Sequence, residues 1–423
     1  MADAAPALPR LAPALPAAAP RAAWMLFWIL LAAGALGLLR LAFTDPAKLW
    51  VCYLANFLFF TGIAQSAVVF SAVTRGCNAR WARPLHRLAE GFAFVLPAAV
   101  LLFIPLIFAA PRLFPWWGHP PARKLPWLLH PFLLGRDLGI LAALAAFSLF
   151  YLYRGARADL GLARRQLPSA YAGRFAAWLC RRWRGEAEEI RRRERSLGRL
   201  WVGLIFAFVY GYSILGMDWN MSLNIHWYDY IYDWFFYITL WYAGLALVAL
   251  AAIAWRRGLR QHAVLDAGRL HDIGELTFAF AIFWTYLFWA QYMVEWFANE
   301  QPNIHLLFMI STTQPWLTIA WITLTLAFFL PFAFGLSRSW KRRAPTLAFI
   351  AVLALAGIWL EQNLVVEASI WHGSPPLLAS ALLGCGFLGG YGLLYLAGMR
   401  RLPFFPLADP LMQEAMVIDA VRH

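Results

Sequence analysis

Residues 48–73 of this 423-residue chain read KLWVCYLANFLFFTGIAQSAVVFSAV, and their only charged residue, Lys48, is the first one. An α-helix rises about 1.5 Å per residue, so about 20 apolar residues cross the hydrocarbon core of a bilayer, which is about 30 Å thick. A soluble helix would carry polar residues along its exposed face, and this stretch has too few of them for that. The stretch therefore predicts a transmembrane helix.

Other apolar runs of similar length occur from end to end of the chain. Including the first, the predicted spans are 24–43, 48–73, 89–110, 132–153, 198–217, 227–254, 275–297, 313–336, 345–365 and 377–399. Hydrophobic residues make up 62% of the chain, and the mean hydropathy is positive. We therefore expect an all-α fold, a polytopic membrane bundle of about ten transmembrane helices.

The net charge of +14 is spread unevenly over the connections between these spans. When the connections are assigned alternately to the two sides, nearly all Lys and Arg residues fall on the side of both termini. The exceptions are Arg40, Lys48, Arg112, Arg123, Lys124 and Arg136. Cytoplasmic loops carry the excess of Lys and Arg, so both termini are expected in the cytoplasm. A nucleic-acid-binding protein would gather its positive charge on one folded face, and this pattern excludes that class.

Composition divides the chain into five predicted segments. They are a disordered Ala- and Pro-rich N-terminal tail (1–23), a first membrane group of four spans (24–153), a basic amphipathic cytoplasmic connection (154–197), a second group of six spans (198–399) and a cytoplasmic C-terminal tail (400–423). The basic connection either rests a helix on anionic headgroups or a neighbouring subunit, or is a solvated loop that only enforces topology. Gly386 and Gly390 have the GxxxG spacing that lets two membrane helices approach, within this subunit or against a partner.

The sequence offers no metal site or redox cofactor site. All nine histidines lie in connections or at the edges of spans, where none can hold a haem in mid-membrane. The four cysteines are scattered and form no CxxC pair, which argues against zinc and iron–sulfur sites. No nucleotide-binding or hydrolase motif stands in a suitable context. We therefore expect no catalytic residue, no metal and no bound cofactor in this chain.

Polar residues within or beside the spans are the functional candidates, because they are costly in lipid. The proton-relay candidates are Glu90, Asp218, Asp272, Tyr286, Gln291, Glu295 and Glu361. Their acids approach both faces, as two proton half-channels would require; alternatively, each acid pairs with a nearby Arg or reaches water. His119 and Asp137 flank the second non-cytoplasmic loop, and they are the quinone-binding candidates because a quinol needs an acceptor for each hydroxyl proton.

Two stretches carry a family resemblance. Residues 217–227 read MDWNMSLNIHW, and the second stretch comprises LHDIGELTF (270–278), FWTY (283–286) and AQYMVEWFAN (290–299). Both resemble the F-type integral membrane subunit of alternative complex III, a bacterial quinol:cytochrome c oxidoreductase, within the NrfD/PsrC-like group. The residues that match its motifs are Asp218, Ser222, Asp272, Tyr286, Gln291, Tyr292 and Asn299.

The resemblance implies a subunit of the bacterial cytoplasmic membrane that packs beside a homologous, larger quinol-binding membrane subunit. The other implied partners are a peripheral iron–sulfur subunit, multihaem cytochrome c subunits and a terminal oxidase. The quinol and the redox groups, haem c and iron–sulfur clusters, would be held by the complex and its other subunits. Where the larger homologue has His-x-Gly-Arg-Pro, this chain has Trp117-Gly118-His119-Pro120-Pro121.

The resulting expectation is an accessory membrane subunit of a quinol-oxidising complex. Such a subunit would complete the membrane domain, and it would either conduct protons or serve assembly alone. Two other functions remain open at this point: an independent secondary transporter, which ten spans with polar mid-membrane groups would also allow, and the quinol-binding subunit itself.

Overall fold

The computed structural model describes residues 18–224, 227–258, 264–298, 301–371 and 373–412, without the side chains of residues 301–305. Its regular elements are all helical, with no strand in the described parts of the chain. Ten helical stretches there are long and apolar enough to cross a membrane, which confirms the predicted helix bundle. The disordered tail predicted for residues 1–23 lies mostly outside the described residues, and the first helix begins at Arg21.

The ten spans follow the predicted runs closely. They are α1 (Arg21–Thr44), α2 (Pro46–Gly76), α3 (Arg83–Glu90) continuing through η1 (Gly91–Phe94) into α4 (Leu96–Leu113), α6 (His130–Gln166), α8 (Glu186–Trp219) continuing into η2 (Met221–Leu223), α9 (Tyr232–Gly258), α10 (Ala267–Ala298), α12 (Trp316–Leu324) continuing through the π-helix η3 (Thr325–Phe329) into α13 (Leu330–Gly335), α15 (Ala344–Ile370) and α16 (Leu377–Met399). The short helices α5 (Leu125–Leu128), α7 (Arg174–Leu179), α11 (Gln301–Thr312) and α14 (Arg338–Arg342) lie in connections.

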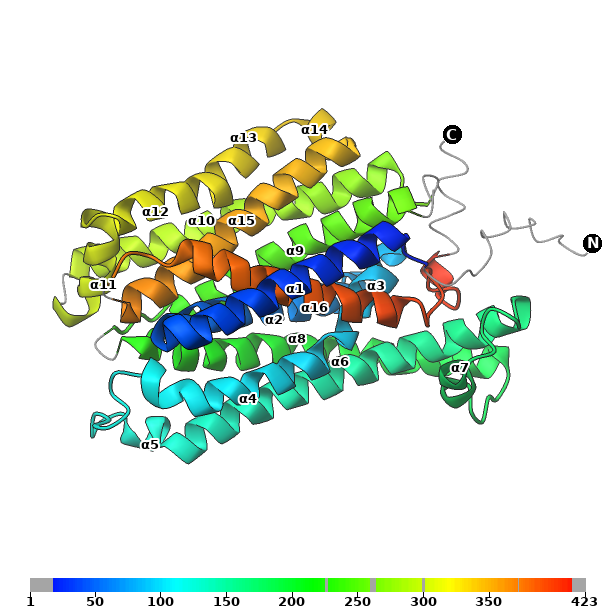
Figure 1. The fold of residues 1–423 in the computed structure, drawn as a ribbon. Coiled ribbons are helices and arrows are strands. Elements are labelled where there is room, and N and C mark those ends of the chain that lie inside the picture. The colour runs from blue at the N-terminus through cyan, green and yellow to red at the C-terminus, as the bar shows by residue number, and fades with distance from the viewer. Residues whose placement is uncertain (1–17, 225–226, 259–263, 299–300, 372, 413–423) are drawn as a thin grey trace, which may run out of the picture.

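The long helices run side by side and alternate in direction, so the bundle has two ends (Figure 1). One end carries the start of α1, together with α3, α7, α14 and the segment 400–412; we call it the terminal end. The opposite end carries α5, α11 and residues 227–231, and we call it the far end. Acids that are distant in sequence meet at each end.

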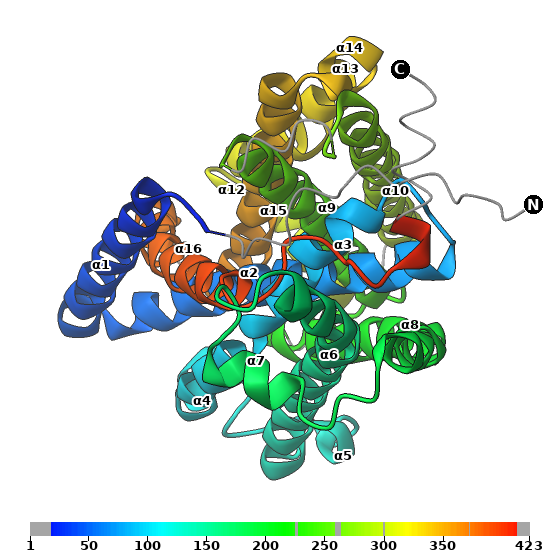
Figure 2. The ribbon, with the colours of Figure 1, turned by 90° about the vertical axis from the view of Figure 1, so that its right-hand side faces the viewer.

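Helix α2 is the centre of the bundle. Of its most apolar 18-residue window, 94% is buried, and the helix packs against α4, α8, α9, α15 and α16 (Figure 2). This burial explains why α2 is apolar on all sides rather than along one face. The four spans before the basic connection therefore share one core with the six that follow it.

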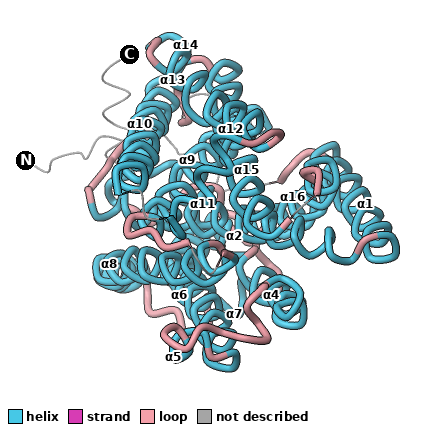
Figure 3. Tube along the Cα trace, turned by 90° about the vertical axis from the view of Figure 1, so that its left-hand side faces the viewer, coloured by secondary structure: helices cyan, strands magenta, loops and turns pink. Residues whose placement is uncertain are grey.

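Helix α1 lies at the periphery and packs mainly on α16 (Figure 3). A Cβ placed on Gly386 of α16 would come within 3.1 Å of the Gly34 Cα on α1. The glycines of α16 thus allow a close approach inside this chain, which is one of the two uses expected for the GxxxG pair. Only 11% of the apolar window of α1 is buried, so most of this helix faces outward.

The span α12–α13 contains a π-helical turn. The Tyr242 hydroxyl of α9 donates a hydrogen bond to the Ala327 carbonyl within this turn, at 2.9 Å. Gly357 of α15 lies directly against the Ala327 backbone. A π turn disturbs the regular hydrogen-bond ladder, and such turns occur frequently beside functional sites.

Helices α6 and α8 both extend into the predicted basic connection, where they remain in contact. Arg157 of α6 donates two hydrogen bonds to the Glu189 carboxylate of α8, at 2.9 and 3.0 Å. Trp178 of the short helix α7 is 62% exposed beside them. The connection thus contains helical structure and an exposed aromatic side chain.

Candidate functional site

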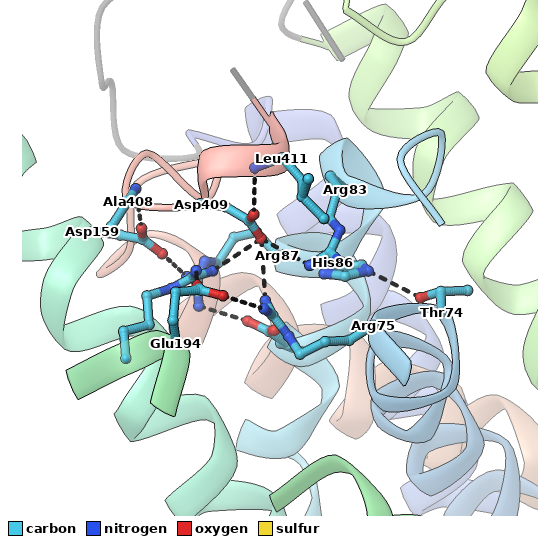
Figure 4. A network of polar contacts seen from close by, with 12 residues as sticks. Thr74, Arg75, Arg83, His86, Arg87, Asp159, Glu194, Ala408, Asp409 and Leu411 are labelled. Carbon is cyan, nitrogen blue, oxygen red and sulfur yellow. Dashed lines mark hydrogen bonds and ion pairs between the residues drawn. The ribbon is translucent and has the colours of Figure 1, made fainter. Parts of the chain in front are cut away.

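A group of charged side chains is buried at the terminal end, where α2, α3, α6, α8 and the C-terminal segment meet (Figure 4). This terminal cluster consists of the buried residues Arg75, Arg83, Arg87, Arg193, Glu90, Asp159 and Asp409, together with Glu194, whose side chain is 39% exposed. Four arginines face four carboxylates, so the formal charges balance. Such balance is needed because an unpaired charge in a buried site costs several kcal/mol, of the order of 3–5.

Asp409 joins the cluster from the C-terminal segment. Its Oδ2 atom lies 3.1 Å from Arg75, 3.2 Å from Arg83 and 3.3 Å from Arg193. Burial alone would raise the pKa of Asp409, but the attraction of these three guanidinium groups outweighs burial and holds the pKa well below its usual range. Asp409 is therefore a carboxylate, and it ties the C-terminal segment to three helices.

Glu90 lies beneath this segment. Its carboxylate accepts an ion pair from Arg87 at 2.9 Å, and Arg87 also pairs with Asp159. Asp159 in turn accepts a hydrogen bond from the Ala408 amide at 2.7 Å. Glu90 thus pairs with a nearby arginine, which is one of the two alternatives that the sequence left open for the acids. It does not reach water, because it is only 1% exposed.

Polar side chains continue from Glu90 toward the middle of the bundle along α2 and α6. Tyr151 is fully buried and lies beside Arg75, Glu90 and Ser71. One helical turn further along α6, the Ser148 hydroxyl accepts a hydrogen bond from the Gln65 amide at 2.9 Å. Residues three or four apart share one face of a helix, so these groups form a continuous polar face.

The chain of polar groups then passes to α16 and α8. The Thr61 hydroxyl lies 2.9 Å from the Tyr391 hydroxyl, one turn beyond Gln65 on α2. Tyr212 of α8 is also buried and lies near Tyr391. Asp218 follows Tyr212 by six residues on α8, which corresponds to a rise of about 9 Å along the helix.

Asp218 and Asp137 meet at the far end and share one cation. Arg136 donates to the Asp218 carboxylate at 2.5 Å and lies 3.7 Å from Asp137. The Trp127 indole donates to Asp218 at 2.8 Å, and the Trp219 indole donates to Asp137 at 2.8 Å. This far-end pair combines two acids, one arginine and two indole donors. Asp218 also lines a cavity of about 330 Å³.

The two predicted quinone-binding residues are not brought together. His119 is exposed, and its backbone amide donates to the Trp116 carbonyl. Neither a hydrogen bond nor an ion pair joins it to Asp137, whose partners are Trp219 and Arg136. The Asp137–Asp218 pairing is a partnership that the sequence did not reveal, because the two acids are far apart along the chain.

Three of the predicted relay residues converge on one pocket near the far end, between α10, α12 and α15. Gln291, Glu295 and Glu361 line this pocket of about 410 Å³. Its other walls are aromatic and aliphatic, and we call it the aromatic pocket; the aromatic side chains are Trp227, Tyr232, Phe235, Trp284, Phe288, Trp289, Tyr292 and Trp321. Among the described residues that line it, there is no Lys or Arg.

The acids of the aromatic pocket have few partners. The Trp227 indole donates to Glu295 at 3.2 Å, and the Gln362 amide donates to Oε2 of Glu361 at 2.9 Å. Oε1 of Glu361 and Oε1 of Gln291 accept no hydrogen bond within the described part of the protein. Trp227 also lines the 330 Å³ cavity, so it separates the aromatic pocket from the far-end pair.

Asp229, which the sequence analysis did not single out, lies beside this pocket in the connection between α8 and α9. Burial raises the pKa of Asp229 to about 6. Its carboxyl group interacts with Gln291 and with Glu295. The acidic stretch YDYIYD at 228–233 was the available signal, although nothing local shows which of its two aspartates is buried.

The remaining relay candidates stand apart from these groups. Asp272 lies near the terminal end of α10, 43% exposed and 3.8 Å from His271. Tyr286 is 64% exposed on the same helix. Among the residues that the structure describes, no group of three His, Cys, Asp or Glu side chains has the arrangement needed to hold a metal ion.

Fold and polar clusters together define a polytopic α-helical membrane protein with buried acids at both ends of its bundle. Comparison with known protein families and with curated proteins finds no match to the chain.

Proposed function

We propose that the chain is an integral membrane subunit of a quinol-oxidising respiratory complex of the alternative complex III type. In this proposal it lies in the bacterial cytoplasmic membrane, with the terminal end and both chain termini in the cytoplasm. The motifs at 217–227 and 270–299 support this assignment, as does the distribution of Lys and Arg. Quinol is a substrate of the complex as a whole, and the haem c and iron–sulfur clusters belong to its other subunits.

Within this complex the subunit conducts protons. The observation that carries this proposal is the line of polar side chains from Glu90 to Tyr391, which leads from the terminal end into the bundle. At the far end, Asp137 and Asp218 begin a second polar region about 9 Å beyond Tyr212. Two proton half-channels that meet across the short gap between Tyr212 and Asp218 would explain why acids are buried at both ends. Without such a role, acids buried in a membrane protein would only lower its stability.

The outer face of α1 supports a place beside a larger homologous subunit. Met25, Ile29, Leu36 and Phe43 are 63%, 63%, 67% and 87% exposed on this helix. Such a face needs lipid or another membrane helix as its neighbour. The peripheral iron–sulfur subunit and the multihaem cytochrome c subunits would then dock on the non-cytoplasmic side, and a terminal oxidase would complete the assembly.

The test of proton conduction is Glu90→Gln in the assembled complex, reconstituted into liposomes. Removing the carboxylate takes away the first proton-exchanging group of the path, so proton translocation per quinol oxidised should fall at least ten-fold. Glu186→Gln, a change of the same kind at an exposed position of the terminal end, should leave it unchanged. Full proton-coupled turnover in an assembled Glu90→Gln complex would show that the subunit serves assembly alone.

A further inference from the structure

The aromatic pocket has the chemistry of a ligand site rather than of a packing defect. Glu361 is 94% buried, that is, 6% exposed, and one of its carboxylate oxygens has no partner in the described structure. The Gln291 side-chain oxygen, on another helix, also has no partner among the described residues. A buried acceptor without a hydrogen bond costs about 1–3 kcal/mol. Two such acceptors around one cavity indicate an occupant that donates hydrogen bonds at two separate points.

The pocket opens toward the apolar outer surface of the bundle. Trp289 and Trp321 line it and are each 57% exposed. Ile322, next to Trp321, is also exposed, at 46%. Glu361 lies nine residues before the end of α15, which places it about 14 Å along the helix from the far end. A ligand can therefore reach Glu361 from the lipid phase without crossing water.

We propose that the aromatic pocket binds the hydroquinone head group of a lipid-soluble quinol. A hydroquinone is a flat ring with hydroxyl donors at opposite ends, which suits acceptors on two helices and aromatic walls. A pocket of about 410 Å³ holds such a ring and leaves its tail in the lipid. The proposal rests on the proposed function only for the identity of the quinol, because a quinol-oxidising complex works where this ligand is present.

Two other occupants fit the pocket less well. An acyl chain would fill the aromatic walls but would leave the acceptors of Glu361 and Gln291 without donors. A quaternary ammonium ion suits aromatic rings and a carboxylate, but it has no N–H or O–H to donate. The far-end pair is also a poorer site for the ring, because Asp218 already accepts hydrogen bonds from Arg136 and the Trp127 indole. Asp137 has one carboxylate oxygen without a hydrogen bond among the described residues, but it is not among the residues that line the neighbouring cavity.

The experiment measures the binding of menadiol, the 2-methyl-1,4-naphthohydroquinone, to the detergent-purified complex by anaerobic equilibrium dialysis. Ala320→Trp fills the pocket from α12 and should remove one bound molecule per copy of this chain. Glu361→Gln keeps the shape of the side chain but replaces an acceptor with a donor, and should weaken this binding about ten-fold. Thr318→Trp, two residues from Ala320 at an exposed position outside the pocket, is the control and should bind normally.

Three results would overturn the proposal: unchanged stoichiometry in Ala320→Trp, loss of the same molecule in Asp137→Asn instead, or a pocket that takes tetraphenylphosphonium but not menadiol. If the chain co-purifies with the expected redox subunits but lacks this menadiol site, the proposed ligand would be rejected and the proposed function would stand. If instead the chain purifies without redox subunits, and Ala320→Trp abolishes its menadiol binding, the proposed ligand would stand and the proposed function would be rejected.

Discussion

Asp409→Asn should release the C-terminal segment from the terminal end. The native carboxylate lies 3.1 to 3.3 Å from three buried arginines, and the asparagine would leave their charges one short of balance. Removing one partner of a buried ion pair costs about 3–5 kcal/mol. Since 1.4 kcal/mol is a factor of ten in an equilibrium constant, the undocked segment should become at least about 100-fold more populated.

Hydrogen exchange reports this change at a single amide. The Ala408 N–H donates to Asp159 and is protected only while the segment is docked. Its exchange should accelerate about 100-fold in Asp409→Asn and stay normal in Glu186→Gln, whose side chain is exposed. Adding Arg83→Gln to Asp409→Asn restores the charge balance and should slow exchange again. Native exchange at Ala408 in Asp409→Asn would refute the argument that these ion pairs dock the segment.

Three further predictions concern the far end and the periphery. Asp229 has a pKa of about 6 against about 3.8 when unfolded, so the free energy of unfolding should fall by about 2 kcal/mol as pH rises from 3.8 to 6, and by about 3 kcal/mol over the whole titration. Thermal unfolding of Asp229→Asn should lack this slope. Arg136→Gln leaves two acids without their cation and should lower the free energy of unfolding by about 3 kcal/mol. Adding Asp218→Asn to this variant should recover part of the lost free energy. A melting temperature of Arg136→Gln equal to that of the native protein would contradict this prediction. Gly386→Val should separate α1 from α16 and lower the free energy of unfolding by about 1–3 kcal/mol. Gly390→Ala, whose Cβ would meet Leu31 at 3.7 Å, should have the melting temperature of the native protein. Equal melting temperatures for the two variants would contradict the close packing of α1 on α16.

The number and position of the spans follow from local sequence. The run predicted at 48–73 became α2, Pro46–Gly76, and the run at 313–336 became the span from Trp316 to Gly335. Both succeed because insertion depends on the apolar character of about 20 consecutive residues, a property of the segment itself. The π turn at 325–329 was not predicted, because hydropathy does not report the hydrogen-bond ladder inside a span.

The partners of the buried charges do not follow from local sequence. Arg75 and Asp409 are 334 residues apart, and only the packing of α2 against the C-terminal segment brings them together. The far-end pair is similar, because Asp137 and Asp218 meet through the contact of α6 with α8. Sequence identified Glu295 and Glu361 as acids within spans, but it gave no sign that they line one pocket.

The proposal that the chain is a subunit of a quinol-oxidising complex is tested most directly by its partners. The chain would be extracted in a mild detergent through an affinity tag, and the preparation would be analysed by subunit mass spectrometry and a reduced-minus-oxidised visible spectrum. The proposal predicts that multihaem cytochrome c and iron–sulfur subunits co-purify, with a c-type haem spectrum and quinol oxidation activity. A colourless single species, obtained under conditions in which other respiratory complexes stay intact, would contradict it and favour an independent transporter.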